Sequence, residues 1–253
     1  LGVWGERHTD YTVNINLTNC DSKEISGKGN VQRVYITGTT GVNNITVTGC
    51  NFLTKATALY SNADGTVVID NCTFKGGQVP VNFNHKADGK QTVAVKNSTF
   101  TNCGDEGEWS AFAAPVRFVN SGKGSLNATI ENNTFTGTVG NNGDILLGDY
   151  REGKESHDVT ATITPNGTTK VRNSGITDEP TPITGKVTAD AKGNITPVKE
   201  EGPSQIVIIS PTQDTPKTDD QKNPTTGAND LVAVAVAAAA LALAGSAIIL
   251  RKD

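Results

Sequence analysis

An eight-residue pattern occurs four times between residues 45 and 135, and it constrains the fold more than any other feature of the sequence. Positions one and three are apolar in every copy, position five is Gly or Asn, and position eight is Phe. Alternating apolar residues predict a strand with one buried face, and Gly or Asn at one place predicts a left-handed turn residue. Each copy therefore predicts strand, turn and strand. The copies are ITVTGCNF (45–52), VVIDNCTF (67–74), VAVKNSTF (93–100) and ATIENNTF (128–135).

Two further segments keep part of this pattern. Residues 15–22 (INLTNCDS) lack the final Phe, and residues 161–168 (ATITPNGT) are interpreted as a degenerate last copy. Between the copies lie short apolar stretches that predict additional strands. These stretches are ALYS (58–61), VPVNF (79–83), PVRFV (115–119) and DILL (144–147).

The spacing of the copies favours a coiled parallel β-solenoid. The four terminal Phe residues are 22, 26 and 35 residues apart, which is too unequal for a propeller blade. In a solenoid each coil stacks the same side chains about 4.8 Å from the previous coil, while loops of different length project outward. An immunoglobulin-like sandwich is the alternative, but sandwiches do not repeat one phrase with its side-chain order intact. We therefore predict an all-β domain over residues 1–198, as the C-terminal part of a longer solenoid.

The repeated phrases resemble the pectate-lyase-like (pectin lyase-like) β-helix superfamily over roughly residues 10–170. This resemblance implies a right-handed parallel β-helix with two or three strands in each repeat. It implies a fold and not an activity, because the superfamily contains both enzymes and non-enzymes.

Stacking would place the residues at position four in one outward column. This column contains Thr48, Asp70, Lys96 and Glu131. The charges of Asp70, Lys96 and Glu131 then alternate between neighbouring coils. Each pair of opposite charges stabilises the fold by about 0.2–1 kcal/mol. We interpret the charge alternation as structural.

The cysteines allow two interpretations. Four cysteines in an exported chain are typical of two disulfides, whose pairing the spacing does not identify. Three of the cysteines, however, occupy the same position of successive copies, which favours a column of buried thiols that pack as small apolar side chains. Position six of successive copies is Cys20, Cys50, Cys72, Ser98 and Asn133, whereas Cys103 lies three residues after Phe100. No Cys or His spacing predicts a metal site, and no cofactor is predicted.

The C-terminal end reads LVAVAVAAAALALAGSAIIL from residue 231 to residue 250, a stretch of twenty uncharged residues. At about 1.5 Å per residue, such a helix spans the roughly 30 Å core of a bilayer. Arg251 and Lys252 follow, and basic residues favour a cytoplasmic end, so the preceding chain is expected outside the cell. The alternative is a buried Ala-rich helix of a globular domain.

A pentapeptide precedes this apolar span. Its residues are Asn223, Pro224, Thr225, Thr226 and Gly227. The order of pentapeptide, span and basic tail (223–253) resembles the cell-wall sorting signal of Gram-positive surface proteins. The usual pentapeptide is LPxTG, and Asn in place of Leu resembles the NPxT variants that other sortase classes read. The resemblance implies that a sortase cleaves between Thr226 and Gly227 and joins the Thr carbonyl to an amine of cell-wall peptidoglycan.

The sorting resemblance also implies a cell-surface location, with the C-terminal helix in the membrane before sorting. Residues 199–222 are rich in Pro, Thr, Asp and Lys, which predicts a disordered, wall-spanning linker. A formal charge of −4 without clustered Lys and Arg gives no reason to expect a nucleic-acid partner.

The insertion over residues 101–114 contains the candidate glycan contacts. They are Trp109, Asp105, Glu106 and Glu108. An exposed aromatic residue can stack on a sugar ring, and paired carboxylates can hydrolyse glycosides. Asp144, Asp149 and Arg151 form a second charged group. We interpret the carboxylates of both groups as solvated loop charges, and no catalytic residue is identified.

Two functions therefore stay open. The first is a wall-anchored adhesin or glycan-binding protein that presents a β-helix to a polysaccharide or host glycan. The second is the C-terminal part of a surface polysaccharide lyase or glycoside hydrolase whose catalytic coils lie upstream. We favour the first, because the repeated outward position is occupied by alternating charges.

Overall fold

The computed structural model of the chain describes residues 2–4, 12–22, 34–37, 41–105, 112–148, 158–173 and 179–199. The chain divides into two units, Leu1–Gly202 and Pro203–Asp253, and all described residues belong to the first. The regular elements of this part are β-strands, which confirms the predicted all-β class. Within these ranges, no helix has the length and apolar character that crossing a bilayer requires.

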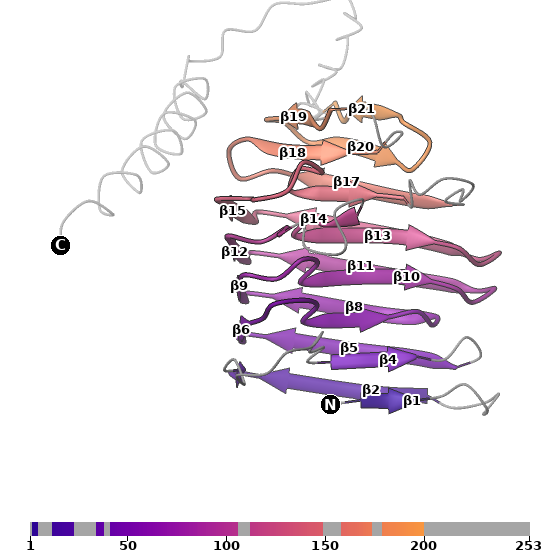
Figure 1. Cartoon of the computed structure of the whole chain (residues 1–253). Coiled ribbons are helices and arrows are strands. Elements are labelled where there is room, and N and C mark those ends of the chain that lie inside the picture. The colour runs from indigo at the N-terminus through magenta and orange to yellow at the C-terminus, as the bar shows by residue number, and fades with distance from the viewer. Residues whose placement is uncertain are drawn as a thin grey trace, which may run out of the picture. The chain divides into compact units, whose positions relative to one another are not determined.

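The strands form three sheets that run along a stack of coils (Figure 1). Sheet A contains β1 (Gly2–Trp4), β4 (Val34–Thr37), β7 (Leu59–Ser61), β10 (Val81–His85), β13 (Val116–Asn120), β16 (Ile145–Leu147), β18 (Thr169–Arg172) and β19 (Thr181–Ile183). Sheet B contains β2 (Thr12–Thr18), β5 (Val42–Thr48), β8 (Gly65–Asp70), β11 (Lys90–Lys96), β14 (Ser125–Glu131), β17 (Val159–Thr164), β20 (Val187–Asp190) and β21 (Ile195–Pro197). Sheet C contains β3 (Asp21–Ser22), β6 (Asn51–Leu53), β9 (Thr73–Lys75), β12 (Thr99–Thr101) and β15 (Thr134–Thr136).

Equivalent positions of successive copies pair directly in these sheets. Val67 of β8 pairs in parallel with Ile45 of β5 on one side and with Val93 of β11 on the other. The degenerate copy is also part of the stack, because β17 pairs in parallel with β14. The four strands predicted between the copies correspond to β7, β10, β13 and β16. Parallel pairing of this kind is incompatible with the antiparallel sandwich considered above.

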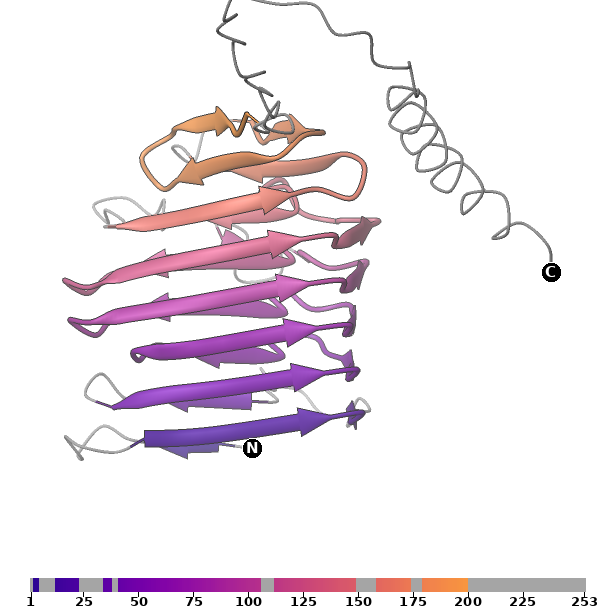
Figure 2. The ribbon, with the colours of Figure 1, turned by 180° about the vertical axis from the view of Figure 1, so that it is seen from behind.

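The last strands do not continue the parallel stack. β19 is antiparallel to β18, β20 is antiparallel to β17, and β21 is antiparallel to β20. Figure 2 shows this layer at the C-terminal end of the coils. Sequence periodicity did not predict the change of direction. Its physical consequence is that β17 and β18 are covered and do not present open edges.

The core lies between the sheets and follows the repeated pattern. The apolar residues at positions one and three are all buried, as predicted: Ile45, Val47, Val67, Ile69, Val93, Val95, Ala128 and Ile130. The position-eight rings form one stack, with centroid distances of 5.2 Å from Phe52 to Phe74, 4.7 Å from Phe74 to Phe100 and 5.1 Å from Phe100 to Phe135. Phe135 is only partly buried, because it ends the stack.

The predicted left-handed turn is present at every copy. Position five has φ values of 63° at Gly49, 51° at Asn71, 49° at Asn97 and 54° at Asn132. Gly and Asn are the residues that adopt this conformation at the lowest cost. At residue 49 a Cβ would also overlap the amide oxygen of Asn19, so the Asn19 side chain would have to move to admit it.

The side chains at position six form a hydrogen-bonded column inside the same corner. The backbone N–H of Cys20 donates to Cys50 Sγ at 3.3 Å, that of Cys72 to Ser98 Oγ at 3.1 Å, and that of Ser98 to Asn133 Oδ1 at 2.9 Å. The side chains of Cys50, Ser98 and Asn133 thus each satisfy an amide of the preceding coil, which explains why this position holds Cys, Ser or Asn, all of which can accept a hydrogen bond. All four cysteines are free thiols, in agreement with the thiol interpretation, although Cys20 in the first coil is exposed.

Cys103 occupies the equivalent place at a second corner, which follows sheet C. Cys72 Sγ donates to Asp70 O at 3.3 Å and to Val47 O at 3.5 Å. In the same way Cys103 Sγ donates to the carbonyl two residues earlier, at 3.4 Å, and to Phe74 O of the preceding coil at 3.7 Å. Asn102 has a φ of 52°, as the turn residue before each column cysteine requires. Cys103 is therefore outside the first column but inside an analogous one.

Candidate functional site

The outward column at position four has the predicted register. Thr48, Asp70, Lys96 and Glu131 pair successively across β5, β8, β11 and β14. Lys96 Nζ lies 3.1 Å from Glu131 Oε2, whereas Asp70 Oδ1 accepts a hydrogen bond from Asn97 Nδ2 at 2.8 Å. The column therefore combines one ion pair with a hydrogen bond between a carboxylate and a turn residue. Both contacts join neighbouring coils, which supports a structural role.

Sheet C lies directly after this corner and has a narrow outer face. Its full strands are three residues long, and side chains alternate between the two faces. The central Phe therefore points into the core, and the residues on either side of it point outward. In β6 the outward residues are Asn51 and Leu53, and in β9 they are Thr73 and Lys75.

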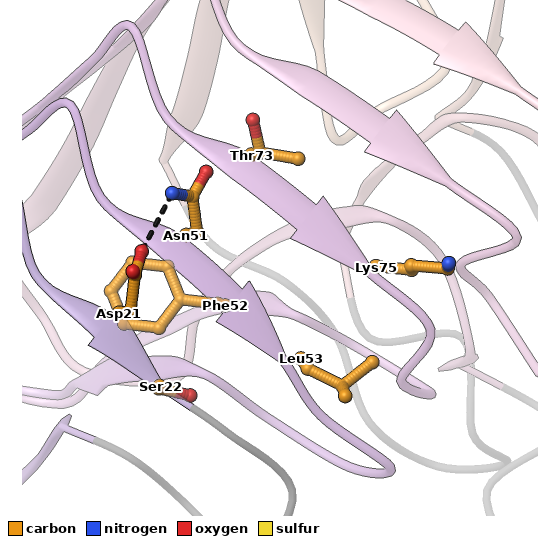
Figure 3. A pocket seen from close by; sticks show the side chains of 7 residues that line it. All are labelled: Asp21, Ser22, Asn51, Phe52, Leu53, Thr73 and Lys75. Carbon is orange, nitrogen blue, oxygen red and sulfur yellow. Dashed lines mark hydrogen bonds between the residues drawn. The ribbon is translucent and has the colours of Figure 1, made fainter.

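A groove crosses this face at the first-coil end of sheet C. It has a volume of about 290 Å³. Its lining residues are Asp21, Ser22, Asn51, Phe52, Leu53, Thr73 and Lys75 (Figure 3). Figure 3 shows that they come from three adjacent strands, with Asp21 and Lys75 on opposite sides of the groove. The groove therefore combines an apolar part, to which the exposed Leu53 contributes, with an acidic side and a basic side.

The polar side of this groove is organised by contacts between β3 and β6. Asn51 Nδ2 donates to Asp21 Oδ1 at 2.7 Å, which orients the carboxylate. Ser22 pairs with Phe52, so the first coil has Ser where the next four coils have Phe. Ser22 Oγ is buried and has no hydrogen-bond partner among the residues that the structure describes. Sequence reasoning missed this site, and no repeated motif of the sequence marks it.

The predicted glycan contacts are not brought together in the described part. Asp105 is exposed, and its backbone N–H lies 3.4 Å from Gly77 O. It lies outside the groove on sheet C. Glu106, Glu108 and Trp109 lie outside the described residues. A glycan contact at this insertion stays a prediction.

The interpretation of Asp144 as a solvated loop charge is wrong. Its side chain is buried, it accepts hydrogen bonds from Thr138 Oγ1 and from the backbone N–H of Lys170, and the latter bond is 2.8 Å long. The carboxylate thus joins β16 to β18 and satisfies a backbone amide of β18. Asp144 is the first residue of DILL (144–147), and its place at the end of a loop suggested exposure to solvent, but the neighbouring coil covers it. Asp149 and Arg151 lie outside the described residues.

A buried histidine forms a second polar cluster, which spacing did not indicate. His85 Nε2 lies 2.7 Å from Asp64 Oδ1, and Nδ1 lies 3.3 Å from Asn120 Oδ1. The three residues come from three successive coils at the corner between sheets A and B. Asn120 Nδ2 also donates to Asp158 O at 3.4 Å. In the described ranges no hydroxyl or thiol is hydrogen-bonded to the imidazole, so the cluster joins coils and lacks a nucleophile.

The remaining predictions concern metals and sorting. The described residues contain no group of three or more His, Cys, Asp or Glu side chains that could hold a metal ion. The pentapeptide 223–227 and the apolar span 231–250 lie outside the described residues. Comparison with known proteins found no matching family model, no matching curated protein and no matching solved structure.

Proposed function

We propose that this chain is a cell-wall-anchored bacterial surface protein that presents a right-handed β-helix for adhesion through glycan binding. The observation that carries the proposal is the order of NPTTG (223–227), an uncharged span (231–250) and the tail Arg251, Lys252 and Asp253. A sortase substrate needs a recognition pentapeptide, an apolar membrane span after it and a basic C-terminal tail, and the chain has these three parts in that order. The span holds the chain in the membrane, and the pentapeptide is then presented outside.

The chemistry of the proposed attachment is an acyl transfer. The sortase thiolate attacks the Thr226 carbonyl, the Thr226–Gly227 bond breaks, and Gly227 leaves with a protonated amine. An amine of the peptidoglycan then attacks the thioester and releases the enzyme thiol. The product retains residues 1–226, so the whole stack of coils stays on the wall.

The stack and the linker have properties that suit presentation. Each described coil from β4 to β13 hydrogen-bonds to a coil on both sides, which makes a stiff body. Residues 199–222 number 24, and fully extended they span about 80 Å, enough to hold the stack away from the membrane. The groove on sheet C supplies a polar and apolar surface suited to a small ligand. Among the described carboxylates, neither exposed Asp105 nor buried Asp144 favours the lyase or hydrolase alternative.

Wall extraction tests the anchoring. The full chain and Thr226→Ala are produced in a Gram-positive host that has sortases, and cells are extracted first with detergent and then with a muramidase. The unchanged chain is expected to need the muramidase and to lose the mass of residues 227–253. Thr226→Ala is expected in the detergent fraction at full mass, while Thr218→Ala in the linker behaves as the unchanged chain. Release of both the unchanged chain and Thr226→Ala by detergent alone would refute the sorting proposal.

A further inference from the structure

The outer face of sheet B is regular and carries no charge along its middle. In Figure 2 the long strands of this sheet lie side by side at the front. Equivalent positions of β5, β8, β11 and β14 pair directly, so their outward residues form columns. Two uncharged columns, at position two and at the residue before the pattern, are half-buried or exposed. Six of their members are Thr or Asn: Asn44, Thr46, Thr66, Thr92, Asn127 and Thr129.

A face of this kind suits a second flat surface better than a small ligand. Small-molecule sites are concave, whereas these short side chains all project from one sheet. Hydroxyl and amide side chains both donate and accept hydrogen bonds, so the face is complementary to a copy of itself. Because the middle columns carry no charge, covering them does not bury an unpaired ion. The chemistry of the face therefore favours another molecule of the same chain as its partner.

The charged column at the edge of the face selects one arrangement of two copies. A twofold axis parallel to the strands turns one sheet over and leaves each column opposite the same column of the second copy. When this axis passes between β8 and β11, Asp70 lies opposite Lys96 of the second copy, and Lys96 lies opposite Asp70. At the other edge, Lys90 lies opposite the register position of Asp64. Opposite charges therefore meet on both edges of the face.

The face has the area of a weak dimer interface. The same axis places β8, β5 and β2 opposite β11, β14 and β17 of the second copy, and the outward residues of β2 and β17 are also Asn and Thr. Near the axis the apolar Val68 lies opposite Ala94. Six strands about 4.8 Å apart, with residues about 3.3 Å apart, present about 650 Å² per copy and about 1,300 Å² in total. Specific interfaces bury about 1,200–2,000 Å², so this face is at the lower end.

We propose that the outer face of sheet B is a self-association surface, on which two copies of the chain bind with antiparallel solenoid axes. Copies that project from two facing cells approach each other in this antiparallel orientation. Many weak contacts between two cells add up through multivalency. This surface adds cell-to-cell adhesion to the glycan binding proposed above, and the association itself requires neither a glycan nor the sorting signal.

Exchange of the edge charges is the sharpest test. Sedimentation velocity of the full chain, residues 1–253, in detergent micelles is expected to show a monomer–dimer equilibrium. Asp70→Lys and Lys96→Asp each place like charges opposite each other, so each variant alone is expected to associate at least about tenfold more weakly. An equimolar mixture of the two variants restores both contacts between opposite charges, and it is expected to associate like the unchanged chain. Mixing would not rescue a variant that had simply lost its fold.

A bulky side chain tests the middle of the face. Thr92→Arg places a long, charged side chain opposite Thr66 of the second copy, and it is expected to abolish the dimer. Thr136→Arg is the matched control, because it makes the same change at an exposed position of sheet C and should leave the association unchanged. Circular dichroism confirms that each variant keeps its strand content.

Four results would overturn the proposal. A chain that stays monomeric up to about 1 mM has no self-association surface of this class. Association that none of the sheet B variants changes places the contact elsewhere, for example on the span 231–250. A mixture that associates no better than its two components contradicts the twofold arrangement. A monomeric chain that binds soluble polysaccharides, and loses them in Thr92→Arg, assigns the face to a glycan.

Discussion

Replacing Phe100 by Ala tests whether the stacked rings hold the coils together. Phe100 is 1% exposed and lies between Phe74 at 4.7 Å and Phe135 at 5.1 Å. Phe-to-Ala changes in cores cost about 3–5 kcal/mol, a total that includes the two stacked pairs at about 0.5–1.5 kcal/mol each. β12 is hydrogen-bonded to β9 and β15 on its two sides, so the backbone has little freedom to close the cavity. We therefore expect Phe100→Ala to lower the free energy of unfolding by about 4 kcal/mol, the middle of this range.

Urea unfolding followed by far-UV circular dichroism measures this loss as a change in the free energy of unfolding. Thr101→Ala is the control, because its side chain points outward from the same strand and should change stability by less than about 0.5 kcal/mol. Phe135→Ala, at the partly buried end of the stack, should cost about half as much as Phe100→Ala. If Phe100→Ala costs less than about 1 kcal/mol, or no more than Phe135→Ala, the rings are not the main contacts between coils.

Three further predictions concern the corners and the thiols. Asn97→Ala should lower the free energy of unfolding by about 1–2 kcal/mol in urea, because φ is 49° there, whereas Asn97→Gly should cost less, and equal costs would contradict this reason. A thiol reagent at pH 8 should label only exposed Cys20 in the native chain and all four thiols after unfolding, and rapid native labelling of more than one thiol would contradict the buried columns. Burial raises the pKa of Cys103 from 9.0 to about 12, so its contribution to stability is complete below about pH 9 and is lost as pH rises toward 12. Cys103→Ala should therefore reduce the alkaline fall in stability measured by urea titration at each pH, and an unchanged slope would refute this.

The column residues were predictable because their periodicity is local. A strand alternates its side chains, a left-handed turn needs Gly or Asn, and stacking repeats both at each coil. The place of each residue in the second copy could therefore be predicted. The structure confirms Asp70 as an outward charge, Asn71 as the turn residue, Cys72 as a buried thiol and Phe74 as a core ring. Cys103 also follows a left-handed turn residue, as the column cysteines do, since the sequence TNC occurs at residues 18–20 and again at 101–103.

Contacts between non-repeated segments were not predictable in this way. His85 meets Asn120 as its direct partner across β10 and β13, and Asp144 meets Lys170 between β16 and β18, but loops of unequal length separate these partners in the sequence. No period in the sequence encodes those loop paths. The antiparallel layer after β18 likewise depends on where the chain reverses, which apolar alternation does not specify.

The sequence by itself determined the strand and turn units, their stacking register, and the resemblance to a sorting signal, because each depends on residues that are neighbours in the chain. Only the tertiary structure decided which polar side chains meet between coils. Asp144 was interpreted from the sequence as a solvated charge, and its hydrogen bond with the backbone of Lys170 makes it a buried link between β16 and β18. Such a contact depends on the neighbouring coil, because a carboxylate is buried without cost only where an adjacent strand supplies the hydrogen-bond donor.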